Sequence, residues 1–244
     1  MNDIANSFID KFSVLDFINV LISGGLFSIG ISFLMNKNIY ESLFSSIIKT
    51  TNVFAVGLII LGCCYVIGTV LQILAILLFS PIKRIIRESF LNESAKGLPQ
   101  IFMKMLEALG LFPIVNNSKK RKTYQVLAQN LFNKKKLGTF VNEKENCGYY
   151  FAYCEYYNAV RGLNGKTEKM RELSGLCESI AVCVLLLLFV SLLLRSSYTV
   201  WLIPLLIGSV YRAVLSRTNW GRMVLATYEA AVDYEESNNT HKSL

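Results

Sequence analysis

Long runs of apolar residues are the dominant pattern along the chain, and they come in two pairs. They cover residues 17–35, 53–79, 176–194 and 198–215. A helix rises about 1.5 Å per residue, so about 20 apolar residues cross a hydrocarbon core of about 30 Å. The pattern therefore predicts four transmembrane helices in two hairpins, 17–79 and 176–215.

Small residues recur at every fourth position in the first two predicted spans. Gly24, Ser28 and Ser32 follow this spacing in the first span, and Cys64 and Gly68 repeat it in the second. Small side chains let helix backbones approach closely in a bilayer, where packing holds helices together. We expect these faces to form helix interfaces, and a pore lining is the alternative.

Gln72, Glu178 and Arg212 are strongly polar residues that fall within the predicted spans. Such groups are costly in hydrocarbon, so we expect them to face a cavity, a partner subunit or the membrane surface. Glu178 is expected near the surface, at the start of the third span. The long side chain of Arg212 can carry its charge to the interface.

The segment between the hairpins is strongly basic. Residues 81–172 hold 17 basic and eight acidic side chains, whereas the loop 36–52 has two basic residues. Basic loops stay on the cytosolic side of a membrane. We therefore expect a multi-pass protein of the bacterial inner membrane with a cytosolic domain at 80–175. The N-terminus, 1–16, and the C-terminal helix and tail, 216–244, are then cytosolic too.

Helical periodicity continues through the predicted cytosolic parts. Ser80 and Pro81 have the sequence of a helix start. Further helices are expected at 101–109, 124–132, 146–162, 166–176 and 220–236. The predicted fold class is therefore all-α, with two transmembrane hairpins flanking a helical cytosolic domain.

The composition does not favour an enzyme. The six cysteines form no CxxC pair and the one histidine lies in the C-terminal tail, so we expect no metal, no cofactor and no catalytic residue. The net charge of +8 is explained by the basic cytosolic domain, so neither DNA nor RNA is an expected partner. Lys83, Arg84 and Arg87 are expected to contact the anionic lipid headgroups of the bilayer.

An unusual concentration of aromatic residues marks the segment 149–157, where six lie within nine positions. Stacked tyrosine rings beside an arginine can hold a nucleobase and its phosphate. The candidate ligand-binding residues are Tyr150, Tyr153, Tyr157, Arg161 and Lys166. Packing within a small helical domain is the alternative use of the same tyrosines.

The stretch that follows mimics a phosphate-binding P-loop without matching it. Gly165, Lys166 and Thr167 have the order that ends this motif, but Val160 stands where the motif requires a glycine. We expect a turn between two helices here. A charged helix then runs into the third span and couples the cytosolic domain to the membrane.

Two spans, a helical domain rich in tyrosine and asparagine, and two more spans entered by a charged run resemble the layout of small bacterial four-span proteins. The resemblance is carried by the aromatic helix from Tyr149 to Asn158 and by the linker from Arg161 to Glu172. Some of these proteins are membrane effectors of antiphage systems gated by nucleotide second messengers. The resemblance implies a membrane-disrupting or channel-like effector whose cytosolic domain is the sensor.

Two functions remain in competition after an enzyme is set aside. An effector or channel requires a symmetric homo-oligomer, because a single four-helix bundle leaves no room for a pore. Its signal is then a nucleotide second messenger or a protein partner. A membrane anchor or adaptor instead recruits a soluble protein through the cytosolic domain and the helix 220–236.

Overall fold

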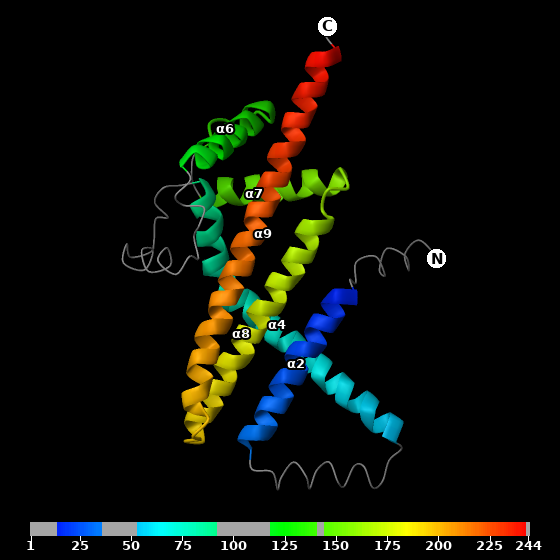
Figure 1. Ribbon diagram of the computed structural model, residues 1–244, viewed down its shortest axis with the longest axis vertical. Coiled ribbons are helices and arrows are strands. Elements are labelled where there is room, and N and C mark those ends of the chain that lie inside the picture. The colour runs from blue at the N-terminus through cyan, green and yellow to red at the C-terminus, as the bar shows by residue number, and fades with distance from the viewer. Residues whose placement is uncertain (1–13, 36–52, 92–117, 141–143, 243–244) are drawn as a thin grey trace. The chain divides into compact units, whose positions relative to one another are not determined.

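The computed structural model describes residues 14–35, 53–91, 118–140 and 144–242 of the chain. The helix expected at 101–109 and the loop 36–52 lie outside these residues. Every regular element in the described part is a helix (Figure 1), which confirms the predicted all-α class. The helices are α2 (Val14–Leu34), α4 (Val53–Leu91), α6 (Ser118–Lys134), α7 (Lys144–Val160), α8 (Gly165–Leu193) and α9 (Thr199–Lys242).

Four of these helices are long and apolar enough to cross a membrane. The candidate segments are Asp16–Leu34, Gly57–Leu91, Gly165–Leu193 and Thr199–Glu235, and an 18-residue stretch within each has a mean hydropathy of 1.9, 2.4, 2.7 and 1.5, respectively. Each overlaps one of the four predicted spans, so the prediction of four apolar helices of membrane-crossing length is confirmed.

Two of the four helices differ from the predicted boundaries. The expected helix start at Ser80 is wrong, because α4 continues to Leu91 with Pro81 inside it. Proline removes one backbone hydrogen bond, but the apolar side chains of Ile86 and Phe90 beyond it are buried and hold the continued helix. α9 likewise runs without a break through residues 216–219, where the fourth span and the C-terminal helix were expected as two helices.

The chain divides into two compact units, and α4, α8 and α9 contribute residues to both. The span unit comprises Met1–Phe79 and Glu172–Ala213, and the head unit comprises Ser80–Arg171 and Val214–Leu244. The four apolar spans therefore fall mainly in the first unit. The aromatic helix α7 belongs to the second.

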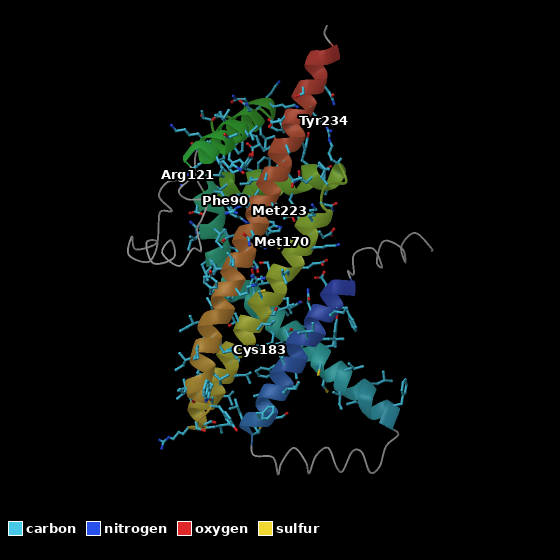
Figure 2. The ribbon with its side chains drawn as sticks, in the orientation of Figure 1. Phe90, Arg121, Met170, Cys183, Met223 and Tyr234 are labelled. Atoms are coloured by element: carbon cyan, nitrogen blue, oxygen red, sulfur yellow. The ribbon has the colours of Figure 1, made fainter. Side chains whose placement is uncertain are left out.

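α8 is the most enclosed helix of the span unit. In its most apolar stretch 44% of the residues are buried, against 17% to 22% in the other three helices. Val182, Leu187 and Cys183, the last labelled in Figure 2, are among its buried side chains. In the parts of the other three helices that belong to the span unit, most large apolar side chains are exposed, as expected of helices that have lipid as their solvent.

The predicted small-residue interface is confirmed where α2 crosses α4. A side chain on Gly24 would collide with the carbonyl oxygen of Cys64 and lie 2.9 Å from the nitrogen of Gly68. A side chain on Gly68 would in turn collide with the carbonyl oxygen of Val20. The hydroxyl of Ser28 is satisfied within α2, where it donates to the carbonyl oxygen of Gly24 at 2.9 Å.

α4, α6, α7 and α9 build the core of the head unit. The helix expected at 124–132 lies within α6, and its residues Tyr124, Ala128, Leu131 and Phe132 are buried. Phe90, at the end of α4 (Figure 2), lies 5.7 Å from the ring of Phe151 on α7. Its ring also lies on Gly221 of α9, where a Cβ would be only 2.7 Å from it.

Candidate functional site

The aromatic helix α7 buries one side and exposes another. Its buried side carries Cys147, Tyr150, Cys154 and Asn158, spaced three or four residues apart. Tyr149 and Tyr156 are exposed. The tyrosines of the candidate ligand site therefore differ in accessibility: Tyr150 is fully buried, whereas Tyr153 and Tyr157 are partly exposed.

Tyr228 of α9 is the centre of the tyrosine cluster. The rings of Tyr150, Tyr153 and Tyr157 meet it at 6.0, 6.1 and 5.1 Å, and all three contacts are edge-to-face. This is the favoured geometry of aromatic pairs, and it fastens α7 to α9. Burial, with the neighbouring Cys154 thiol, raises the pKa of the Tyr150 hydroxyl, so this group stays neutral.

Arg161, directly after α7, is held by two contacts. Its guanidinium lies 5.0 Å from the centre of the Tyr157 ring, and it forms an ion pair with Glu235 of α9. The side chains of Arg161 and Glu235 remain 46% and 34% exposed. The guanidinium is therefore within reach of a ligand, but it is already neutralised.

Tyr157 and Asn158, both on α7, bury polar side-chain atoms. The side-chain amide of Asn158 donates to the carbonyl oxygen of Val224 at 3.0 Å. The hydroxyl of Tyr157 and the amide oxygen of Asn158 are buried and have no hydrogen-bond partner among the described residues. Buried polar groups are nearly always paired, so these two atoms mark the contact of α7 with α9 as incompletely satisfied.

Lys166 stands apart from the other four candidate residues. It is exposed near the start of α8, and no contact among the described residues links it to Arg161 or the tyrosines. The predicted turn before α8 is confirmed, and Gly162 adopts a φ of 69° in it. α8 then continues from Gly165 to Leu193, as predicted for the charged helix that enters the third span.

An open groove of about 360 Å³ lies between α7 and the first turns of α8. Arg171 crosses it and pairs with Glu155 at 3.0 Å and with Glu168 at 3.9 Å. Tyr156, Asn164 and Thr167 complete its polar lining. None of the five candidate ligand-binding residues lines this groove.

Gln72, Glu178 and Arg212, the polar residues singled out in the predicted spans, have different surroundings. Glu178 is only 2% exposed, and its carboxylate accepts a hydrogen bond from the Ser174 hydroxyl at 3.2 Å. Gln72 is half-buried and Arg212 is exposed. No contact among the described residues brings the three together.

The expected lipid-contacting residues on α4 are only partly available for that role. Arg84 donates to Glu88 at 2.8 Å within the same helix, so its charge is neutralised. The Nε of Arg87 is buried. Among the described residues, no three His, Cys, Asp or Glu side chains are grouped so that they could hold a metal ion.

Sequence reasoning missed the α9 side of this site. Tyr228 and Glu235 complete the surroundings of Tyr157 and Arg161, but nothing in the local sequence points to them. The hydrogen bond from Asn158 to Val224 joins residues 66 positions apart, a separation at which periodicity carries no information. A helix was expected at 220–236, but its sequence does not indicate which of its residues contact α7.

The fold defines the class of this chain: its four long apolar helices are those of a multi-pass helical membrane protein. No family model, curated protein or solved structure matches the sequence or the fold.

Proposed function

We propose that the chain is an oligomeric inner-membrane effector of channel-like type, which perturbs the membrane when its cytosolic head unit senses a ligand or a partner. A role in antiphage defence follows from its resemblance to four-span effectors. The observation that supports the proposal best is the contact of α7 with α9. α9 contributes both the fourth apolar span and the residues that hold Tyr157 and Arg161.

The ion pair of Arg161 with Glu235 gives this contact the properties of a switch. Pairs with this much exposure contribute about 0 to 1 kcal/mol, so an incoming anion can replace the carboxylate at little cost. A phosphate binds a guanidinium through two parallel hydrogen bonds and carries more charge than Glu235. The unpaired hydroxyl of Tyr157 is a second group that a ligand would satisfy.

The experiment is to measure membrane potential and dye entry in bacteria that express the chain from a tightly controlled promoter, alone and with its genomic neighbours. Depolarisation or dye entry supports the effector. If it requires a neighbour, the head unit reads a signal or a partner. An intact potential under both conditions rejects the effector function.

Variants of the ion pair then test the sensor. Glu235→Gln frees Arg161 and is expected to lower the amount of signal needed for depolarisation. Arg161→Gln or Tyr157→Phe is expected to abolish depolarisation in response to the signal. Arg222→Gln is the matched control, because it removes the same charge from an exposed position on α9. A response that survives both Arg161→Gln and Tyr157→Phe rejects this site as the sensor.

A membrane anchor or adaptor is the second candidate. Tyr156 and Val160, on the outer side of α7, are each 68% exposed, and large exposed side chains beside a groove suit a soluble protein partner. An adaptor leaves the membrane potential intact and co-purifies with its partner. Tyr156→Ala should then reduce recovery of the partner, and Tyr149→Ala, at another exposed tyrosine of α7, should not.

A further inference from the structure

The longest acid-free stretch of the head unit contains α6. Residues 108–142 hold seven basic side chains and no acidic one. The last three of these basic residues are Lys134, which ends α6, and Lys135 and Lys136, which lie in the turn that precedes Leu137. We call residues 134–137 the lysine turn.

The backbone fixes the shape of the lysine turn. The amides of Lys135, Lys136 and Leu137 donate to carbonyl oxygens of the preceding turn of α6 at 2.9, 3.1 and 3.0 Å. Lys136 adopts a φ of 56°, a conformation that glycine usually provides at a helix end. All three lysines are exposed, and so is Leu137, at 50%.

Aromatic rings pack beside the lysine turn. Phe132, in the last turns of α6, contacts the rings of Phe140 at 5.1 Å and Tyr149 at 5.7 Å. The amine of Lys135 lies 5.5 Å from the centre of the Tyr153 ring. Exposed lysines, an exposed leucine and the half-exposed Tyr149 thus form one ordered surface patch.

The acids described around this patch have other partners. Four carboxylates of the head unit are paired with arginines: Glu88 with Arg84, Glu155 and Glu168 with Arg171, and Glu235 with Arg161. Within the described ranges no ion pair involves a residue of the lysine turn, and the exposed Glu145 of α7 forms none with it. Among the described residues, the three lysines of the patch therefore have no acidic partner.

We infer that the lysine turn is a docking surface for an anionic lipid bilayer. Lysines attract acidic headgroups, while leucine and tyrosine side chains enter the boundary between headgroups and hydrocarbon. A bilayer suits the patch better than a nucleic acid, because the chain itself carries four apolar helices that keep it at a membrane. The inference holds equally for an effector and for an adaptor.

The test uses the full chain with a tryptophan reporter, Leu137→Trp, reconstituted into vesicles that contain brominated lipids. Bromine quenches a tryptophan that touches the lipid, and the unaltered chain gives the background from Trp201 and Trp220. Vesicles are made of phosphatidylcholine alone or with about a third phosphatidylglycerol. We expect quenching in the anionic vesicles that falls when salt is raised to about 0.5 M, since screening then acts within a few ångströms.

The lysines are tested by changing them in the reporter chain. The triple change Lys134→Gln, Lys135→Gln and Lys136→Gln should abolish the additional quenching, because each lysine contributes about fivefold to partition onto an anionic surface. The control triple, Lys166→Gln, Lys169→Gln and Arg222→Gln, removes the same charge elsewhere in the head unit and should leave quenching unchanged. Circular dichroism verifies that both triples remain helical.

Three outcomes overturn the inference. Quenching that is equal in the two kinds of vesicle shows that acidic headgroups are not recognised. Quenching that survives the lysine triple places the attraction elsewhere. Absence of quenching, combined with lysine-dependent binding of single-stranded nucleic acid in a gel shift, identifies the patch as a nucleic-acid surface instead.

Discussion

The absence of a side chain at one residue decides how closely α2 and α4 approach each other. Gly24 faces the backbone of Cys64 and Gly68, whereas its neighbour Gly25 has nothing within 4 Å of where its Cβ would be. Backbone atoms cannot move aside as the end of a flexible side chain can. Gly24 and Gly25 are therefore neighbours in the sequence, but a methyl group would collide with backbone atoms only at Gly24.

Gly24→Ala is expected to destabilise the span unit by about 1 to 3 kcal/mol, the usual effect of overpacking a tight contact. Gly25→Ala is the matched control and should have little effect. Thermal unfolding of the purified protein in detergent, followed by circular dichroism, compares the two. Equal stability of both variants would show that the helices do not cross at Gly24.

Buried titratable groups make the head unit sensitive to alkali. Burial raises the pKa of the Cys147 thiol to about 11 and that of the Tyr124 hydroxyl to about 12. Both groups are neutral when protonated, and the unfolded chain loses these protons near the ordinary values of 9.0 and 10.0. Stability is therefore complete below pH 9 and falls between pH 9 and 12, because there the unfolded state binds fewer protons.

Cys147→Ala tests the contribution of one thiol. The variant should lose less stability between pH 9 and 11 than the unaltered protein, while the onset stays near pH 9, because burial also raises the pKa of the Cys154 thiol. Thermal unfolding at pH 8 to 11 measures the loss for each protein. An equal loss in both proteins would mean that the Cys147 thiol is not buried in solution.

Among the connecting elements, the turn from α7 to α8 depends on one conformation. Gly162 has a φ of 69° and free space around it, whereas Gly165 opens α8 with an ordinary backbone and equally free space. An L-residue in the left-handed conformation costs about 1 to 2 kcal/mol. Gly162→Ala should destabilise the head unit by about this amount.

Gly165→Ala serves as the control for that turn, and it should be neutral or slightly stabilising, since alanine favours a helix. Urea unfolding of both variants in the same detergent measures the difference. Greater damage from Gly165→Ala than from Gly162→Ala would contradict the observed turn.

A helix could be predicted where the pattern that indicates it lies within its own residues. The apolar runs gave the four long helices, and the spacing from Tyr124 to Phe132 gave the buried face of α6. The continuation of α4 through Pro81 was missed, because the burial of Phe90 against Phe151 outweighs the local preference of proline for a helix start. Arg161 was identifiable as a candidate, but its pairing with Glu235 depends on tertiary contacts.

For the whole molecule, the basic residues of 81–172 predict the orientation in the membrane. The protein should resist extraction with alkaline carbonate, because four apolar helices hold it in the bilayer.

A green fluorescent protein fused after Leu244 should fluoresce, and alkaline phosphatase at the same position should be inactive, since both report a cytosolic C-terminus. Active phosphatase there would reverse the proposed orientation.

α9 links the length of the chain to the angular position of its residues. Its 44 residues form one helix with about 100° between neighbours. One residue inserted between Tyr228 and Glu235 turns Glu235 by about 100° relative to Tyr228. Glu235 then leaves Arg161, while Tyr228 keeps its contact with Tyr157. The spacing of these two residues along α9 is therefore as much a structural requirement of the head unit as their identity.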